Sequence, residues 1–383
     1  MRIIVTGGGT GGHIIPALAT LTYLTVDNHR IETLYIGSIR GLEAQIIPQH
    51  GFPFKSIATG KIRRSSRGRI GLLTQENIKD MFSVPLGFLQ ALRILNNFKP
   101  DVVFSTGGYV ALPASIAAWC LGIPLIAHEQ TTTIGLANRI SSVFCTRFAL
   151  SFGEARADLP RWVQKRSMVT GNPIRPETLA GSHVRAIARF ACSDTDKVIF
   201  ITGGALGAAV INQAVAAVAT ELLSKYTVIH QCGLRHLETL TSIKNTLPLH
   251  LQDRWKLVGF MDATTMADAW AIARLVVSRA GAGTVNESLI LRKPMIFVPL
   301  VPTSRDEQTK NALRSVRLGV AQVIKQAECT GPALLHTITN ILDHPNVLEK
   351  MATVTGDAPI TDATSRICKL IAEVAGWNIA PTK

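Results

Sequence analysis

The sequence predicts an α/β protein made of two doubly wound, Rossmann-like halves. Short apolar segments typical of buried parallel strands recur along the chain, with helical stretches between them. Two of these segments run straight into similar glycine-rich turns, at residues 7–12 and 203–208, and an apolar helix follows each turn. Between the halves, residues 170–176 contain two prolines and a glycine, which interrupt any regular element.

The expected strands alternate with helices, as in parallel sheets. In chain order they are residues 2–6, 33–36, 102–105, 124–127, 198–202, 227–231, 275–278 and 295–300. The first domain is expected to span residues 1–169 and the second residues 170–363. Residues 364–378 carry apolar side chains at helical spacing and should form a helix that packs on a domain surface. The sequence leaves open whether this helix packs on the first domain. Ligands of such sheets gather at the carboxyl ends of strands, so the active site is expected in a cleft between the two halves.

The composition narrows the class of partner. Forty Lys and Arg against 26 Asp and Glu give a formal charge of +14, which attracts nucleic acid, anionic lipid or phosphorylated substrates. Aromatic residues make up only 6%, and neither zinc-finger spacing nor a base-stacking strand motif is present, so nucleic acid is not expected. The six cysteines are scattered without a C-x-x-C pair, so the sequence predicts neither disulfides nor a zinc site.

Two segments bear on the cellular compartment. The N-terminal apolar run is too short for a signal peptide and is better explained as the first strand, so we expect a cytoplasmic protein. Residues 102–127 carry no charge, which raises the alternative of a membrane span. Three glycines and two prolines interrupt this stretch and favour a strand, a turn, a short helix and another strand.

The first glycine turn, at residues 7–12, matches the G-x-G-x-x-G pattern of diphosphate-binding loops. A nicotinamide site would need an acid at the end of the second strand, where the chain reads Tyr-Ile-Gly-Ser instead. His13 directly follows the turn, and a histidine there is a candidate general base for an attacking hydroxyl. Two structural alternatives remain: glycines kept only for a tight turn, and a histidine that merely begins a helix.

Polar residues also follow two later strands of the first half. His128, Glu129 and Gln130 end the strand that begins near residue 124. His128 and Glu129 are either a second acid–base pair, with Glu129 catalytic, or the fixing point of the loop to Gly135 and Asn138; the sequence slightly favours the second role. The turn 107–109 gives a further glycine loop that suits an acceptor phosphate.

In the second half, residues 278–287 are predicted to form a strand end, a glycine turn and a helix start, where free N–H groups suit a diphosphate. Glu287, one helical turn further, can accept hydrogen bonds from both ribose hydroxyls. This favours a sugar nucleotide. Residues 306–311 follow another strand and could contact the transferred sugar. Asp194 and Asp196 form a D-x-D pattern but precede a strand, at the wrong edge for a metal site. No cofactor is required by this interpretation, and assistance by a divalent ion is left open.

A basic run at residues 61–69 is followed by apolar side chains, a pattern suited to a loop that touches anionic lipid. A solvated loop is the alternative. The candidate membrane residues are Arg63, Arg64, Arg67, Ile70, Leu72 and Leu73.

Six motifs in order resemble the MurG-type transferases, which make lipid II for peptidoglycan. They are residues 8–13 with Pro16, 106–110, 128–130, 171–175, 281–287, and Gln308 with Asn311. The resemblance covers nearly the whole chain. It implies the GT-B fold and an inverting transfer of N-acetylglucosamine from UDP-N-acetylglucosamine to the undecaprenyl-diphosphate-linked acceptor, lipid I, at the cytoplasmic face of the inner membrane. Anionic inner-membrane lipids and proteins of cell-wall synthesis and division are the further candidate partners.

Carried over by motif, the resemblance implies catalytic roles for His13 and Glu129. The implied substrate-binding residues are Thr10, Gly11, Gly12, Tyr109, His128, Thr131, Asn138, Arg175, Ala205, Met261, Ala282, Gly283, Thr284, Val285, Asn286, Glu287, Gln308 and Asn311. Four residues depart from the family pattern: Thr131 stands where an Asn is usual, Ala205-Leu206 where Ser-Gln is usual, and Glu307 where a His is frequent. Two alternatives remain, a sugar-nucleotide 2-epimerase of the same fold and a non-catalytic adaptor that binds nucleotide and membrane in a division complex.

Overall fold

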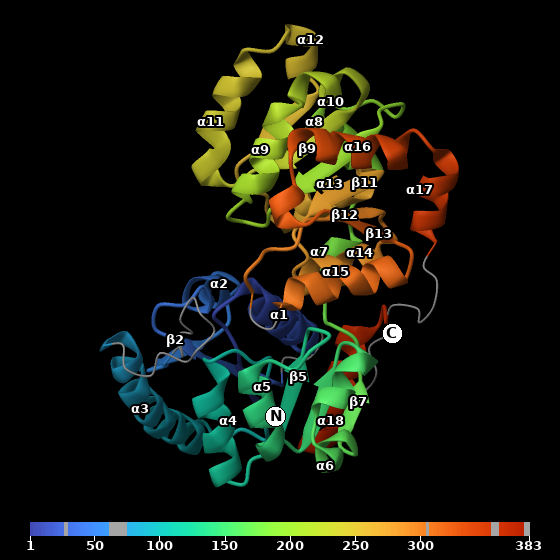
Figure 1. The fold of residues 1–383 in the computed structure, drawn as a ribbon. Coiled ribbons are helices and arrows are strands. Elements are labelled where there is room, and N and C mark those ends of the chain that lie inside the picture. Colours follow the sequence, from blue (N-terminus) through green and yellow to red (C-terminus); the bar gives the residue numbers. More distant parts are fainter. Residues whose placement is uncertain (27–29, 61–74, 304–305, 354–359, 379–383) are drawn as a thin grey trace. The chain divides into compact units, whose positions relative to one another are not determined.

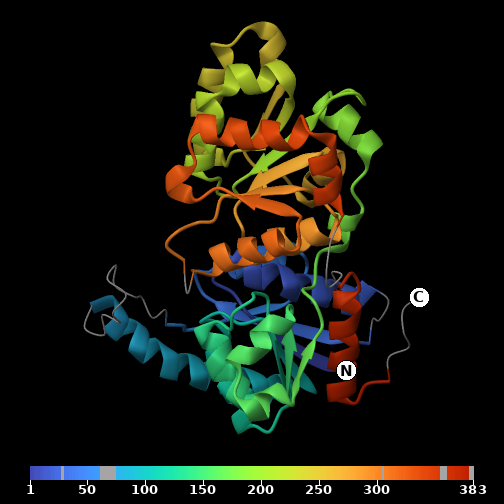
Figure 2. The same cartoon turned by 45° about the vertical axis from the view of Figure 1, so that its right-hand side comes forward.

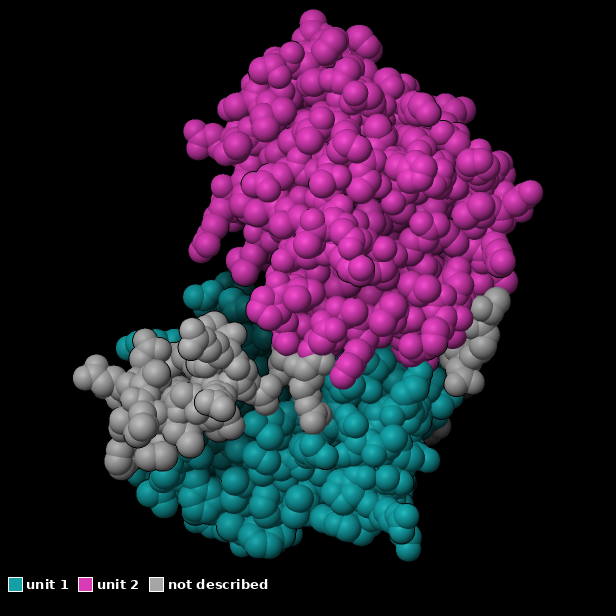
Figure 3. Space-filling model, in the orientation of Figure 1, with its two compact units in different colours: residues 1–175, 360–383 teal, residues 176–359 magenta. Residues whose placement is uncertain are grey.

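The computed structural model describes residues 1–26, 30–60, 75–303, 306–353 and 360–378 (Figures 1 and 2). The chain divides into two compact units, shown in two colours in Figure 3. Unit 1 comprises residues 1–175 and 360–383, and unit 2 comprises residues 176–359. The division falls a few residues from the expected borders at 169/170 and 363/364, because residues 170–175 and 360–363 pack in unit 1.

Unit 1 is built on a seven-stranded parallel sheet of order β3-β2-β1-β4-β5-β6-β7. Its strands are β1 (Arg2–Thr6), β2 (Glu32–Ser38), β3 (Phe54–Ile57), β4 (Val102–Ser105), β5 (Leu125–Glu129), β6 (Arg147–Leu150) and β7 (Ser167–Val169). The strand order reverses between β1 and β4. This is the switch point beside which parallel α/β sheets bind ligands.

Helices cover both faces of this sheet. They are α1 (Gly11–Val26), α2 (Glu43–Gln49), α3 (Gln75–Phe98), α4 (Ala111–Cys120), α5 (Leu136–Phe144), the 3₁₀ helix η1 (Gly153–Asp158), α6 (Arg161–Gln164) and α18 (Ala363–Ala375). One apolar cluster contains side chains of α1 and α18, and another contains side chains of α3 and α4. Helix α18, red in Figure 2, buries Ile367, Leu370 and Ile371 in the first cluster, so the C-terminal helix belongs to unit 1.

Unit 2 repeats the architecture around a six-stranded parallel sheet of order β10-β9-β8-β11-β12-β13. Its strands are β8 (Val198–Thr202), β9 (Thr227–Gln231), β10 (Trp255–Val258), β11 (Leu275–Ser278), β12 (Met295–Phe297) and β13 (Ala321–Val323). Its helices are α7 (Pro176–Leu179), α8 (His183–Phe190), α9 (Ala209–Ala217), α10 (Ala219–Lys225), α11 (Leu234–Asn245), α12 (Leu249–Gln252), α13 (Ala263–Ile272), α14 (Ala282–Ile290), α15 (Glu307–Arg317), η3 (Gln326–Glu328), α16 (Gly331–Leu342) and α17 (Pro345–Ala352).

The eight expected strands are present, and most differences lie at their ends. The strand expected at 295–300 ends at Phe297, because Pro299 has no N–H to extend the ladder. The uncharged segment 102–127 forms β4, α4 and most of β5 inside unit 1. Among the residues that the structure describes, no helix combines the length and apolar character that a membrane crossing needs.

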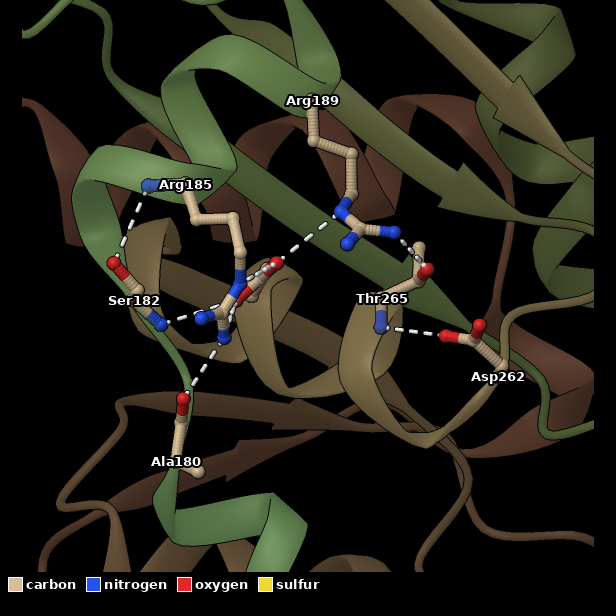
Figure 4. Close-up of polar contacts among 7 residues, drawn as sticks. Ala180, Ser182, Arg185, Arg189, Asp262 and Thr265 are labelled. Carbon is tan, nitrogen blue, oxygen red and sulfur yellow. Dashed lines mark hydrogen bonds and ion pairs between the residues drawn. The ribbon is translucent and has the colours of Figure 1, made fainter.

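A buried carboxylate ties α8 to α13 in unit 2. Asp268 is fully buried, and Arg185 donates to it from Nη2 at 2.6 Å and from Nε at 2.8 Å, while Arg189 Nε lies 3.1 Å away. Figure 4 shows both arginines pointing from α8 toward α13, where Asp262 caps the helix through the Thr265 N–H. Burial alone would raise the pKa of Asp268, but these hydrogen bonds hold it below its usual value. The cluster is a structural clamp, because its charges are paired with one another.

Candidate functional site

The first glycine turn joins β1 to α1, and two buried side chains hold it in place by hydrogen bonds. Glu43 is fully buried, and its carboxylate accepts from the backbone N–H groups of Gly9 at 3.1 Å and Ser38 at 3.0 Å. The Tyr35 hydroxyl donates to the Gly7 carbonyl at 2.8 Å. Burial, together with the charge of Glu43, raises the pKa of Tyr35, which keeps it a donor. The turn is therefore a fixed platform from which α1 begins at Gly11.

His13 lies in the first turn of α1 and contacts two neighbouring loops. Its Nδ1 atom lies 2.9 Å from the Thr106 carbonyl oxygen and 2.9 Å from Gln130 Oε1. The Thr106 hydroxyl also donates to the His13 carbonyl at 2.8 Å. These contacts use one ring nitrogen and tie the histidine to the ends of β4 and β5. The structure thus brings the candidate base to the strand-order reversal of unit 1.

The turn after β4 packs directly on the turn after β1. A side chain at Gly108 would place its Cβ 2.3 Å from the Gly8 carbonyl oxygen, and one at Gly9 would place it 2.7 Å from the Tyr109 ring. Gly9, Gly107 and Gly108 also have positive φ angles of 84°, 89° and 80°. Both the close approach and the backbone conformation require glycine at Gly9 and Gly108. Tyr109 and the glycine turn predicted to bind phosphate therefore lie together.

Glu129 is buried and its carboxylate is occupied by its own loop. It accepts from the backbone N–H groups of Thr131 at 3.1 Å and Gly135 at 2.9 Å, and from Asn138 Nδ2 at 3.0 Å. The Thr131 hydroxyl lies 2.8 Å from the same carboxylate. Of the two roles predicted for Glu129, this geometry favours fixing the loop, since each carboxylate oxygen already has donors. A catalytic role for Glu129 remains a prediction.

The site of unit 2 lies at the start of α14, after β11. Gly281 precedes the helix in an extended conformation, and Gly283 lies within its first turn. A Cβ at either glycine would meet no described atom within 4 Å, and neither glycine has a positive φ angle. Neither packing nor backbone conformation therefore explains these two glycines. Open space beside the free N–H groups of a helix start suits the approach of a diphosphate.

Other polar residues of this region hold the loops in place. Asn286 Nδ2 donates to the Ala282 carbonyl at 2.7 Å, and Asn311 Nδ2 lies 3.3 Å from the Ala280 carbonyl. Gln308 Oε1 accepts from the Leu300 N–H at 2.9 Å, after β12. Arg279 Nη1 donates to the Val298 carbonyl at 2.9 Å, and burial lowers the pKa of this guanidinium. The structure thus gathers residues 279–287, 308 and 311 at the carboxyl ends of β11 and β12.

Thr284 and Glu287 are partly exposed on α14, while Val285 is buried against the core. Met261 is also a core residue, just after β10, so only its backbone is suited to a ligand contact. Ala205 lies in an exposed turn between Gly204 and Gly207. Arg175 closes the first segment of unit 1, and its Nε has no hydrogen-bond partner within the part of the chain that is described.

Sequence reasoning missed Glu43 as the anchor of the first turn and gave Gln130 no role of its own. The predicted membrane residues Arg63, Arg64, Arg67, Ile70, Leu72 and Leu73 lie outside the described residues. Within the described ranges, no group of three or more His, Cys, Asp and Glu side chains could hold a metal ion.

Comparisons with known proteins define the class. The model of the glycosyltransferase family 28 N-terminal domain matches residues 3–150, and that of the family 28 C-terminal domain matches residues 198–367. With two parallel sheets that each carry a glycine turn before a helix, the chain is a glycosyltransferase of the GT-B fold.

Curated relatives make the assignment specific. A protein of Clostridium perfringens is 38% identical over 341 residues, which cover 89% of this chain and 90% of the relative. A protein of Halalkalibacterium halodurans is 33% identical and covers 98% of this chain and 100% of the relative. Both are named UDP-N-acetylglucosamine–N-acetylmuramyl-(pentapeptide) pyrophosphoryl-undecaprenol N-acetylglucosamine transferase. This chain belongs to that family.

Solved structures agree with this result. Acinetobacter baumannii MurG superimposes with a TM-score of 0.72 at 26% identity, covering 97% of this chain and 99% of that one. UDP-GlcNAc 2-epimerase of Neisseria meningitidis superimposes with a TM-score of 0.68 at 15% identity, covering 97% and 100%. At that identity the epimerase shares the fold alone.

Proposed function

We propose that the chain transfers N-acetylglucosamine from UDP-N-acetylglucosamine to undecaprenyl-diphosphate-linked N-acetylmuramoyl peptide, with inversion, to give β-1,4-linked lipid II. The observation that carries this proposal is the identity of 36–38% with transferases of that name over about nine-tenths of the chain. It is supported by a candidate base in unit 1 and by open space beside a helix start in unit 2.

In this proposal unit 2 binds the donor. The N–H groups at the start of α14, from Ala282 to Thr284, bind the diphosphate. Glu287 accepts from the ribose hydroxyls, and Gln308 and Asn311 lie near the transferred sugar. The helix dipole contributes typically 0.3–1 kcal/mol, up to about 2 kcal/mol when partly buried. Positive charge from Arg279 or Arg175 would further favour departure of UDP.

Unit 1 binds the acceptor and takes up the proton. The acceptor diphosphate binds between the two glycine turns of this unit. The residues that contact it are Thr10, Gly11 and Gly12 of the first turn and Tyr109 of the second. His13 removes the proton from the acceptor 4-hydroxyl as its oxygen attacks C1 of the donor sugar. The C1–oxygen bond to UDP breaks, and UDP leaves with the electron pair. General-base catalysis of this kind is typically worth about 10²–10⁴ in rate.

We also propose that the enzyme acts as a peripheral protein on anionic lipid at the cytoplasmic face of the inner membrane, where proteins of cell-wall synthesis and division are candidate partners. In unit 1, helices α3, α4 and α5 carry exposed apolar side chains, among them Leu86, Leu89, Trp119, Ile140 and Val143. Arg93 and Arg139 are exposed on the same helices. Apolar side chains beside basic ones suit a surface that rests on anionic lipid.

The test is incubation of radiolabelled UDP-N-acetylglucosamine with a short-chain lipid I analogue. Radiolabel in the lipid product only when both substrates are present supports the transferase. Conversion of the donor alone to its 2-epimer would instead support the epimerase alternative. Binding of nucleotide without turnover in either mixture would support the adaptor alternative, provided that the circular dichroism spectrum shows a folded protein.

A further inference from the structure

We infer that Gln130 is a positioning residue that holds His13 in the tautomer with its proton on Nδ1, so that Nε2 is the basic atom. This inference rests on the proposed function, in which His13 takes the acceptor proton. It deepens that function because it assigns the reacting atom of the ring and the side chain that selects it.

The orientation of the Gln130 amide follows from its neighbours. Nε2 of Gln130 lies 2.8 Å from the Thr106 carbonyl oxygen and 3.1 Å from the His128 carbonyl oxygen. Both neighbours can only accept, so the amide nitrogen must face them; a flipped amide would place oxygen against two oxygens. The amide oxygen therefore points to His13. Gln130 is 1% exposed, which leaves little access for water to replace these partners.

The tautomer of His13 follows from the Gln130 amide together with the Thr106 carbonyl. The Nδ1 atom is 2.9 Å from the Gln130 amide oxygen and 2.9 Å from the Thr106 carbonyl oxygen. Two acceptors face this nitrogen, so it must carry the proton that they share. In a neutral imidazole the other nitrogen then holds the lone pair. Nε2 is thus the basic atom even before substrate binds.

His128 completes the network from the other side of the amide. Its Nε2 atom donates to the Gly171 carbonyl at 3.0 Å, and its Nδ1 atom accepts from Gln130 Nε2 at 3.0 Å. The ring is fully buried, and this burial lowers the pKa of His128 to about 4. A neutral His128 can accept from the amide, whereas a protonated ring would present a second donor to it. The network therefore runs from Gly171 through His128 and Gln130 to His13.

The same contacts serve the ring after proton transfer. When Nε2 takes the proton from the acceptor hydroxyl, the new bond forms between the hydroxyl oxygen and C1, and UDP departs with the electrons of the broken bond. The imidazolium still donates from Nδ1 to Thr106 and Gln130. Two preformed acceptors lower the free energy of this cation without any movement of the ring.

The first test is the tautomer itself, read by nitrogen NMR of wild-type enzyme labelled with ¹⁵N-histidine. His13→Ala identifies the His13 signals. We expect a pyrrole-like Nδ1 and a pyridine-like Nε2 in the neutral ring. The opposite pattern would overturn the inference. This measurement needs neither substrate nor turnover, so it stands apart from any failure of the proposed function.

The second test is Gln130→Leu, which keeps the side chain's approximate volume and removes the amide. Because the Thr106 carbonyl still accepts from Nδ1, we expect the Nδ1–H tautomer of His13 to become less dominant without disappearing. We also expect kcat to fall about tenfold or more, with the KM for the donor little changed. The control is Asn212→Leu, because Asn212 is a buried amide that contacts a buried histidine in unit 2. The control should change stability and leave the His13 spectrum and kcat unchanged. An unchanged tautomer and an unchanged kcat in Gln130→Leu would contradict the inference.

Discussion

Among the described residues, each unit buries one histidine in an interior strand of its sheet, and the two histidines have different surroundings. His128 in β5 and His230 in β9 are both fully buried, and burial lowers their pKa values to about 4 and about 3. In unit 2 both ring nitrogens of the histidine have protein partners. His230 contacts Asn212 Oδ1 at 3.0 Å and accepts from Trp255 Nε1 at 3.4 Å. In unit 1 the network continues through Gln130 to His13 at a glycine turn.

The two hydrogen-bond networks suit different roles, one structural and one chemical. A closed network with every polar group paired stabilises the sheet and its helices, as around His230. A network that ends in a ring nitrogen without a protein partner in the described contacts prepares that atom for substrate, as at His13. Unit 2 instead offers open space beside a helix start. The comparison therefore supports the proposal that unit 1 takes up the proton and unit 2 binds the donor.

The largest effect is expected from His13→Ala. Removing the proposed general base should lower kcat by about 10²–10⁴ while the donor KM stays nearly constant, because the proposed donor site is in unit 2. Steady-state kinetics with both substrates check this. His230→Leu is the matched control and should lower stability without a comparable loss of kcat in the folded fraction. If the control variant lost kcat to the same degree, the proposal that His13 acts in proton transfer and His230 only in stability would be wrong.

Gly283→Ala tests whether the space beside α14 is reserved for the donor. No described atom obstructs the new methyl group, and alanine favours a helix over glycine by roughly 0.5–1 kcal/mol, so stability should rise slightly. The donor KM should rise about tenfold, the loss of one or two hydrogen bonds to a charged group.

Gly203→Ala provides the contrast, since its Cβ would lie 2.2 Å from the Ala208 nitrogen. Thermal melting should show a clear loss of stability for that variant. A Gly283→Ala enzyme with unchanged donor KM would argue against a diphosphate at this helix start.

The proposed membrane contact of unit 1 predicts an effect on lipid binding. Leu89→Glu removes an exposed apolar side chain, worth roughly 1–2 kcal/mol of contact with lipid, and should weaken binding to sedimented anionic vesicles by about 5- to 30-fold. Leu249→Glu, which changes a still more exposed leucine in unit 2, is the control and should leave vesicle binding intact. Equal loss in both variants would contradict a face confined to unit 1.

Neutralising Arg63, Arg64 and Arg67 should weaken vesicle binding further, by about 1 kcal/mol for each charge. The loss should be larger at low salt than at high salt, because salt screens charges at a surface. Equal retention on anionic and neutral vesicles would exclude an electrostatic contribution from these arginines.

The smallest effect concerns pH and involves both units. The folded pKa values of His128 and His230 lie below the ordinary value of 6.5, so unfolding below that pH lets each ring bind a proton. The stability that the two neutral histidines give the folded protein is fully present above about pH 6.5 and is lost as the pH falls toward about 4. At about pH 5.5 the expected loss is about 1 kcal/mol for each histidine. Urea unfolding at about pH 7.5 and 5.5 should show it, and His230→Leu should reduce the pH dependence. An identical pH dependence would refute the assignment.

The sequence predicted the elements whose signals are local. Buried apolar strands such as β1 and β8, the glycine turns, and His13 after the first turn are all visible as short patterns. Strands β3, β6, β7, β10 and β13 were missed, because three or four residues with charged or polar members carry little strand signal.

The rest of the site depends on contacts between distant parts of the chain. Glu43 anchors Gly9 from 34 positions away, and Gln130 meets His13 from 117 positions away. No local pattern could assign those roles, because only the folded sheet brings β2, β4 and β5 to one edge. Likewise, Glu129 was considered for catalysis on its neighbours in sequence, whereas its hydrogen bonds favour a role in fixing the loop.

Calorimetric titration with UDP-N-acetylglucosamine tests most directly the central claim that unit 2 binds the donor, because it measures donor affinity without any chemical step. Wild-type and His13→Ala proteins should bind with Kd values that agree within about twofold, whereas Glu287→Gln should bind about tenfold more weakly. An absence of binding to folded wild-type protein, or a Kd that depends on His13 and not on Glu287, would contradict the account.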